Sequence, residues 1–186
     1  MQNKLRIIGG DWRSRQISFV DAPGLRPTPA RVRETLFNWL QYEIIGKHCL
    51  DLYAGSGALG FEAASRGAKS VIQVENNAQA CRCLKDNAAA LSAKQISLVQ
   101  SDAAHYLSGD AEAFDIVFLD PPFGLDLVVQ TCRQLEERGW LARHAKIYIE
   151  TERRFDFSSG ASIPENWRQL KSKSAGEVGY HLFERT

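Results

Sequence analysis

The residues with the clearest chemistry in this sequence are an aspartate, two prolines and a phenylalanine, Asp120-Pro121-Pro122-Phe123. The prolines stiffen the backbone and remove its N–H donors, so the Asp120 carboxylate and carbonyl oxygens remain as acceptors. Such acceptors suit an amino group on a planar ring, because binding its N–H groups favours a pyramidal nitrogen with a directed lone pair. Phe123 can stack on that ring. We predict that these four residues form a catalytic clamp for an amine; the alternative is a rigid turn between a strand and a helix.

Three glycines, Gly55, Gly57 and Gly60, have the G-x-G-x-x-G spacing of a nucleotide-binding turn. They follow an apolar run that ends at Asp51, and a helical pattern begins near Ala58. Glu75 comes about 20 residues after Gly55, the offset of a carboxylate that binds ribose hydroxyls. The sequence therefore predicts a site for an adenosine-type cofactor. The alternative is that the glycines serve only a tight turn.

Two aspartates favour S-adenosylmethionine over a dinucleotide at this site. Asp51 lies four residues before Gly55, where its carboxylate can receive an ammonium group but would repel a pyrophosphate. Asp102 follows a predicted strand and can accept the amine N–H of an adenine, or it can simply cap the next helix. The predicted cofactor-binding residues are Asp51, Tyr53, Ala54, Gly55, Gly57, Glu75, Asn76, Asp102 and Ala103.

The overall composition is that of an ordinary globular protein. The chain has 186 residues, of which 44% are hydrophobic and 24% charged, which suits a single core. We find no apolar stretch long enough to span a membrane and no secretory signal at the start, so we expect a cytoplasmic protein. Its four cysteines have no paired spacing, which predicts reduced thiols and no metal site.

Positive charge is concentrated at the N-terminus. Residues 1–33 contain seven lysines and arginines and two aspartates, a net charge of +5, whereas the whole chain has +1 and the remainder therefore −4. A basic arm on a mildly acidic domain is typical of a protein that binds a polyanion at one end. A solvated basic face is the simpler alternative.

The arm is predicted to be a short extension of the main domain. Residues 4–8 and 16–20 have β-like patterns and form an expected hairpin, and the proline-rich residues 21–29 connect it to a helix. We expect Thr28 to cap this helix, with Pro29 in its first position. The predicted domains are thus residues 1–29, a β-hairpin with its connector, and residues 30–186, the catalytic domain.

The rest of the chain alternates between strands and helices, which indicates an α/β protein with a mostly parallel, Rossmann-like sheet. Two β-like runs at the end predict an antiparallel hairpin, making seven strands in all. The expected strands are 48–53, 70–75, 96–100, 114–119, 145–150, 167–173 and 180–185, and the expected helices are 58–66, 77–91, 103–107 and 125–138.

Taken together, these motifs resemble the class I S-adenosylmethionine-dependent methyltransferases, and Asp120–Phe123 resembles the motif of the amino-methylating members. Further motifs follow in the order seen in the ribosomal RNA small subunit methyltransferase D family. They are Arg6-Ile-Ile-Gly-Gly10, Arg26-Pro-Thr28, Arg31-Val-Arg-Glu34 and Gly176-x-x-Gly179. The resemblance spans nearly the whole chain. It implies methylation of the N2 amine of one guanine in 16S rRNA, within the small ribosomal subunit or an assembly intermediate.

The basic arm and this resemblance together predict which residues contact RNA. They are Arg6, Arg13, Arg15, Arg26, Thr28, Arg31 and Arg33. We expect a monomer without a metal and without a membrane partner. Two other hypotheses stay open: methylation of another amine, such as adenine N6 or a protein glutamine, and a non-catalytic RNA-binding assembly factor.

Overall fold

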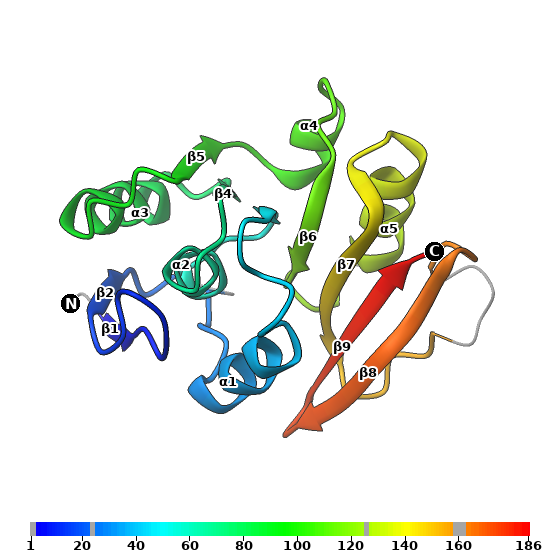
Figure 1. Cartoon of the computed structure of the whole chain (residues 1–186), viewed down its shortest axis with the longest axis horizontal. Helices are drawn as coiled ribbons and strands as arrows, with labels where there is room; N and C mark the ends of the chain where they lie inside the picture. The colour runs from blue at the N-terminus through cyan, green and yellow to red at the C-terminus, as the bar shows by residue number, and fades with distance from the viewer. Residues whose placement is uncertain (1–2, 23–24, 125–126, 158–162) are drawn as a thin grey trace.

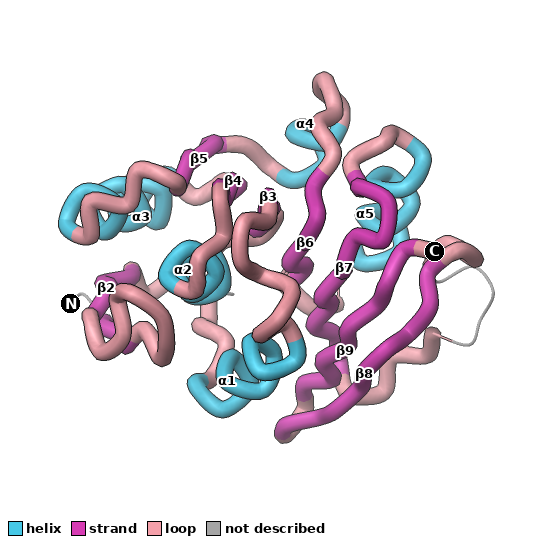
Figure 2. The backbone as a smooth tube through the Cα atoms, viewed as in Figure 1, coloured by secondary structure: helices cyan, strands magenta, loops and turns pink. Residues whose placement is uncertain are grey.

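The computed structural model describes residues 3–22, 25–124, 127–157 and 163–186. Its centre is a seven-stranded sheet with the order β5-β4-β3-β6-β7-β9-β8 (Figures 1 and 2). The strands are β3 (His48–Asp51), β4 (Ser70–Glu75), β5 (Ile96–Gln100), β6 (Phe114–Leu119), β7 (Leu141–Glu152), β8 (Trp167–Ala175) and β9 (Val178–Arg185). Neighbours from β5 to β7 are parallel, and β9 pairs antiparallel with β7 and β8. The predicted fold class is confirmed.

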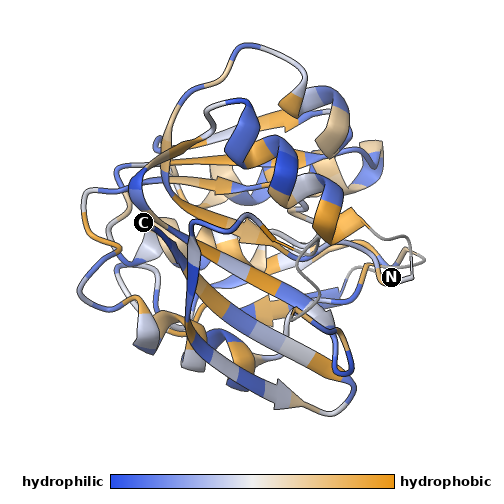
Figure 3. Ribbon diagram, turned by 90° about the vertical axis from the view of Figure 1, so that its right-hand side faces the viewer, coloured by the Kyte–Doolittle hydropathy of each residue, from blue (hydrophilic) through white to orange (hydrophobic). Residues whose placement is uncertain are grey.

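Helices cover both faces of the sheet. They are α1 (Ala30–Trp39), α2 (Ala58–Ser65), α3 (Ala78–Ala90), α4 (Ala103–Leu107) and α5 (Leu127–Glu137). Apolar residues of α4 and α5 share one core with the sheet, and those of α1 and α2 share another. The inner strands are accordingly mostly hydrophobic in Figure 3, while hydrophilic residues lie on the outer sides of the helices. Residues 125 and 126 of the predicted last helix lie outside the described residues.

A separate antiparallel hairpin, β1 (Asn3–Arg6) with β2 (Gln16–Phe19), lies beside α2 and α3 (Figure 1). Ile7 and Ile17 are each 1% exposed and pack in one apolar cluster with Phe61 of α2 and Leu84 of α3. The predicted hairpin is therefore present, and it is fixed to the main domain by a small core of its own.

A buried glutamate on α2 adds polar contacts to this attachment. Glu62 is 0% exposed, and its carboxylate accepts the backbone N–H groups of Ile8 at 2.9 Å and Gly9 at 2.8 Å. Arg66 pairs with it at 2.8 Å and Arg33 of α1 at 3.5 Å. One carboxylate thus ties the hairpin, α1 and α2 together, so the hairpin is held in position relative to the helix that follows the glycine turn.

Within the described ranges, no helix is long and apolar enough to cross a membrane.

Candidate active site

Four carboxylates line the carboxyl edge of the parallel strands. Asp51 and Glu75 are the last residues of β3 and β4, Asp120 directly follows β6, and Glu150 lies near the end of β7. These strands are adjacent in the order β4-β3-β6-β7, and the register of β6 and β7 brings Glu150 beside Asp120. Open α/β sheets bind their ligands at this edge. The structure therefore brings the two predicted motifs, the glycine turn and the Asp120 loop, to one site.

The three positions of the turn are occupied by glycine for different structural reasons. Gly57 precedes α2 with φ 78°, and a Cβ there would lie 2.5 Å from Leu84. A Cβ on Gly60 would lie 2.4 Å from the amide nitrogen of Gln73. Gly55 also has a positive φ, 52°, but a Cβ on it would meet no described atom closer than 3.7 Å. Packing within the protein thus requires Gly57 and Gly60, whereas Gly55 leaves space in which a ligand can approach the backbone.

Asp51 is a buried acid whose environment suits a cationic ligand. It is 2% exposed, and its Oδ2 accepts the Gly60 N–H at 2.9 Å. Burial is the main cause that raises the pKa of Asp51 to about 7; hydrogen bonds from Gly60 and Gln73 lower the pKa, and Glu75 and Glu150 raise it. The Gln73 side-chain oxygen is buried without a hydrogen-bond partner in the described part of the chain. An ammonium group beside Asp51 would stabilise the ionised carboxylate, so the site fits the predicted cofactor.

The pKa of Asp51 predicts a pH-dependent gain of stability in the Asp51→Asn variant. The folded pKa of about 7 lies above the ~3.9 of an aspartate in an unfolded chain, so the native protein loses stability as the pH rises between these values. Above the folded pKa the native chain has lost the full amount of stability, on the order of a few kcal/mol. The asparagine variant has no charge to bury and does not lose it. Urea unfolding from about pH 4 to about pH 8 measures the difference.

The exposed Asp86→Asn exchange on α3 serves as the control and should show no such trend. If Asp51→Asn changed the free energy of unfolding by the same amount at every pH, the burial of the Asp51 charge would not contribute to the stability of the chain.

Glu75 is oriented by two backbone donors. Its Oε2 accepts the Gly55 N–H and its Oε1 the Asn77 N–H, both at 2.8 Å. Each carboxylate oxygen keeps a second lone pair, which can accept a hydroxyl. Asn76 between these contacts is exposed. The arrangement is compatible with the predicted ribose contact, which stays a prediction.

The remaining cofactor residues have identifiable structural partners. Asp102 caps α4, because its Oδ1 accepts the His105 N–H at 2.8 Å. Capping is thus one role of Asp102, and the predicted adenine contacts of Asp102 and Ala103 stay predictions. The Tyr53 hydroxyl bonds to Thr131 of α5 at 2.8 Å, which ties the loop after β3 to α5. Its neighbour Ala54, 6% exposed, donates its N–H to β4 at 2.9 Å.

Thr28 has a different role from the one predicted. Pro29 is the N-cap residue of α1, and no side chain caps that end. Thr28 is 5% exposed, and its hydroxyl donates to Glu150 Oε1 at 3.0 Å and lies 3.4 Å from Asp120 Oδ2. The prediction that Thr28 caps the helix is wrong, and its burial removes it from the predicted RNA surface. Its hydroxyl instead links the clamp to the adjacent strand.

Glu150 is a site residue that our sequence analysis missed. It is 3% exposed, and its Oε1 also accepts the Tyr148 hydroxyl at 2.9 Å. Burial raises the pKa of Glu150, although the bonds from Tyr148 and Thr28 lower it. Burial also raises the pKa of Asp120 well above its usual range, with further contributions from Glu150 and Asp51. The sequence did contain a signal for Glu150, since it is a single acidic residue near the carboxyl end of an apolar strand.

The clamp loop presents an apolar side chain at the surface. Pro121 is buried, Pro122 is exposed, and the Phe123 ring is 43% exposed although it is large and hydrophobic. A ring left open beside Asp120 is available to stack on a planar ligand. This supports the predicted role of Phe123 without testing it.

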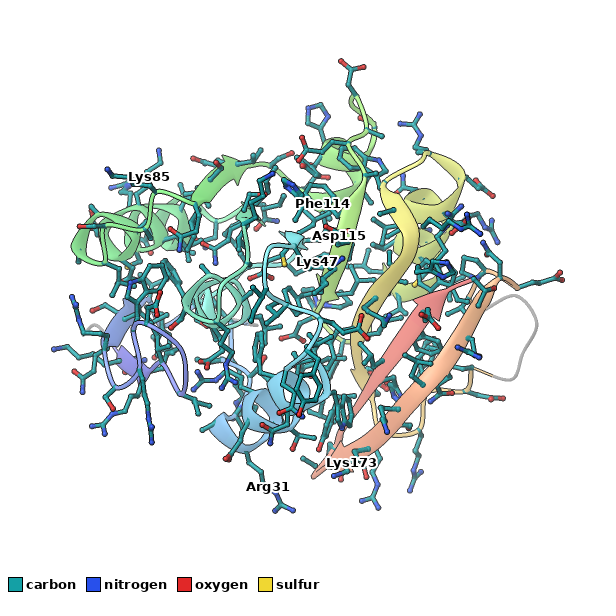
Figure 4. All side chains as sticks on the ribbon, in the orientation of Figure 1. Arg31, Lys47, Lys85, Phe114, Asp115 and Lys173 are labelled. Atoms are coloured by element: carbon teal, nitrogen blue, oxygen red, sulfur yellow. The ribbon has the colours of Figure 1, made fainter. Side chains whose placement is uncertain are left out.

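The predicted RNA-contacting arginines divide into two groups. Five are exposed: Arg6, Arg13, Arg15, Arg26 and Arg31. Figure 4 shows Arg31 pointing away from α1. Arg33 is only 4% exposed, and its guanidinium donates to the carbonyls of Thr28 at 3.1 Å and Arg6 at 3.0 Å. The placement of Arg33 among RNA contacts is therefore corrected, because it connects α1 to the connector and the hairpin.

The four cysteines are buried, which agrees with their predicted role as packing thiols. Among the described residues, no three His, Cys, Asp or Glu side chains are arranged to hold a metal ion.

Comparison with known proteins gives matches over nearly the whole chain. The family described as Conserved hypothetical protein 95 matches residues 5–184. A protein of Escherichia coli (strain K12) described as "Ribosomal RNA small subunit methyltransferase D" is 45% identical over 183 residues, 98% of this chain and 90% of that protein. Its Haemophilus influenzae counterpart is 42% identical, covering 98% and 95%. A solved structure described as "Putative methyltransferase yhhF from Escherichia coli" has a TM-score of 0.88 at 44% identity and covers 98% of both chains.

Proposed function

This chain belongs to the ribosomal RNA small subunit methyltransferase D family, and we propose from that premise that it methylates the N2 amine of one guanine in 16S rRNA. S-adenosylmethionine is the proposed methyl donor. The observation that carries the proposal is the position of Asp120, which lies at the same sheet edge as Asp51 and Glu75. A carboxylate that can hold an amine is thus next to a turn that can hold the donor.

The donor-binding residues fit S-adenosylmethionine by the chemistry of each. The buried Asp51 suits its ammonium group, Gly55 leaves the backbone open to a ligand, and Glu75 has lone pairs for the ribose hydroxyls. Asp102 has an exposed carboxylate for the adenine amine. When bound, the donor supplies an electrophilic methyl group on a sulfonium. Binding the two substrates side by side is the main contribution of such a site.

At the acceptor side, the residues of the clamp act on the amine. Asp120 accepts an N–H of the guanine amine, the loop carbonyls accept the other, and Phe123 stacks on the base. The nitrogen lone pair is thereby directed out of the ring plane and toward the methyl group. The target base must leave its stack to reach Asp120, which is how enzymes that modify bases gain access to them.

The exposed arginines of the hairpin supply the contacts to the rRNA backbone. We expect the double variant Arg13→Glu, Arg15→Glu to bind rRNA at least about tenfold more weakly and to lower the salt slope of binding by about 2, because two phosphate contacts are lost. Affinity for S-adenosylmethionine should not change, since both residues lie on the hairpin. Filter binding across a series of salt concentrations measures the affinity for rRNA and its salt slope. Calorimetry measures the affinity for S-adenosylmethionine.

Arg143→Glu provides the matched control for charge reversal. Arg143 is exposed but lies near the start of β7, at the opposite edge of the sheet from Asp120. Its reversal should leave rRNA affinity nearly unchanged. If the hairpin variant bound rRNA as tightly as the native chain, the hairpin would not be the RNA-binding arm.

Transfer of a tritiated methyl group to different polymers tests the proposed substrate. We expect label in 16S rRNA or small-subunit particles and none in DNA or in protein. Label in DNA adenine or in a protein glutamine would support the alternative amine acceptors. Failure to bind S-adenosylmethionine in calorimetry would instead support the non-catalytic assembly factor.

Three further features complete the proposal. Residues 1–29 act as an arm that contacts RNA through its exposed arginines and reaches the clamp at Thr28, and residues 30–186 act as the catalytic domain. The protein acts as a monomer on the small subunit or an assembly intermediate. With 16S rRNA as substrate, the cytoplasm is the expected compartment.

A further inference from the structure

The buried carboxyl group of Glu150 and the half-buried one of Asp120 share a single hydroxyl at the candidate active site. Thr28 Oγ1 is 3.0 Å from Glu150 Oε1 and 3.4 Å from Asp120 Oδ2. A threonine hydroxyl has one proton, so it can donate to only one of the two carboxyl groups at a time. When it donates to Glu150, its oxygen is free to accept a proton from Asp120. The three side chains therefore form a path along which a proton can move from Asp120 to Glu150.

We propose that Glu150, reached through the Thr28 hydroxyl, takes up the proton that the acceptor amine loses when it is methylated at Asp120. This inference rests on the proposed function, because the proton comes from the amine that Asp120 is proposed to hold. Glu150 is 3% exposed, and the Thr28 hydroxyl lies within hydrogen-bond distance of both its carboxyl group and that of Asp120. Its role is therefore that of a terminal proton acceptor behind the residue that binds the amine.

The step balances without any additional reactant. The nitrogen lone pair forms the new N–C bond, and the electron pair of the broken C–S bond stays on sulfur. As this bond forms, positive charge develops on the nitrogen and one proton moves from it to Asp120 Oδ2. Asp120 passes this proton to Thr28 Oγ1, while the original Thr28 proton moves to Glu150 Oε1. Asp120 is again ionised, Thr28 is unchanged, and Glu150 is neutral.

The electrostatics of the site favour keeping this proton inside it. Before transfer, the reacting groups include the carboxylates of Asp120 and Glu150 and the sulfonium of the donor; afterwards they include one carboxylate, a neutral carboxyl and a neutral sulfide. The net charge is the same, so no new charge has to be created in a region of low dielectric constant, where charge is costly. Between turnovers the neutral Glu150 can return the proton through the same path when the site opens to water.

The surroundings of the pair also favour an uptake of one proton. Three groups from neighbouring positions face the pair. Tyr148 donates to Glu150 and lowers the pKa of Glu150, whereas Asp51 on β3 raises the pKa of Asp120. Tyr180 on β9 is the register partner of Glu150. Burial raises the pKa of both Asp120 and Glu150, and the charge of Glu150 raises that of Asp120 further. Two such carboxyl groups titrate as a pair rather than singly.

Single-turnover methyl transfer in the Glu150→Gln and Thr28→Val variants tests the relay. Glutamine keeps an oxygen for the Thr28 and Tyr148 bonds but cannot take a proton, and valine has the shape of threonine without the hydroxyl. Each variant should transfer methyl ~10²-fold more slowly and lose the pH dependence that belongs to the pair. Thr28→Ser restores the hydroxyl and should rescue the rate, and Thr35→Val on α1 is the control for an unrelated threonine.

A second readout does not depend on activity. In the free protein, ¹³C-carboxyl NMR should show Asp120 and Glu150 titrating as a coupled pair, and Glu150→Gln should leave Asp120 with a single transition at lower pH. Native rates and an unchanged pH profile in Glu150→Gln, or independent titration of the two acids, would overturn the relay. If the native chain transfers no methyl group to rRNA, the proposed function fails, which is a distinguishable result.

Discussion

Methyl transfer by the Asp120→Ala variant is expected to fall by ~10²–10³-fold, while its affinity for S-adenosylmethionine stays close to that of the native chain. The loss is large because alanine cannot accept the N–H of the amine, so the nitrogen lone pair stays delocalised in the ring. Removal of Asp120 also ends the path to Thr28 and Glu150. Single-turnover kinetics measure the chemical step, and calorimetry measures donor binding separately.

Asp120→Asn is the graded control for this experiment. Asparagine keeps one acceptor oxygen at the same place but cannot receive a proton, so its rate should lie between those of the native and the alanine chains. A rate in Asp120→Ala within a few-fold of native would show that Asp120 does not hold the amine. An equal loss of donor affinity would instead indicate a general disruption of the site.

The Glu62→Ala variant is expected to lose ~3–5 kcal/mol of unfolding free energy, the range for removing one partner of a buried ion pair. Glu62 is 0% exposed, and without it the buried charge of Arg33, itself 4% exposed, loses its ion-pair partner. The N–H groups of Ile8 and Gly9 also lose their acceptor. Urea unfolding followed by tryptophan fluorescence measures the change.

Glu34→Ala is the matched control, because Glu34 is an exposed glutamate on α1. Its removal should change the unfolding free energy by no more than about 0.5 kcal/mol. Because Glu62 anchors the hairpin, rRNA affinity should decrease in Glu62→Ala even at temperatures where the variant is folded. A loss of stability similar to that of Glu34→Ala would show that the carboxylate does not fasten the hairpin.

Much of the fold could be predicted from the sequence because the chain alternates between short apolar strands and helical patterns, two of which are followed by a left-handed glycine, Gly67 or Gly139. The bounds of β4, β5, α4 and β6 agree with the predicted 70–75, 96–100, 103–107 and 114–119. β7 is longer than the predicted 145–150. His144 has a φ of 62° and the register with β6 shifts nearby, so a bulge accommodates polar residues that interrupt the apolar pattern.

The site was predictable where its residues lie in local motifs. The glycine turn, Glu75 and Asp120 could be located because each directly follows or ends a strand. Glu150 and Thr28 could not be linked, because their bond joins positions 122 residues apart. The local pattern likewise could not distinguish the buried Arg33 from the exposed Arg31 two residues earlier, because only the packing of α1 against the hairpin and α2 decides which arginine faces inward.

The most direct measurement is mass mapping of modified nucleotides in 16S rRNA from cells lacking this chain, complemented with the native gene or with Asp120→Ala. We predict that one N2-methylguanine is absent without the chain, returns with the native protein, and does not return with Asp120→Ala. An unchanged set of modified nucleotides, or the loss of a methyl group from a base other than guanine, would contradict the proposed function.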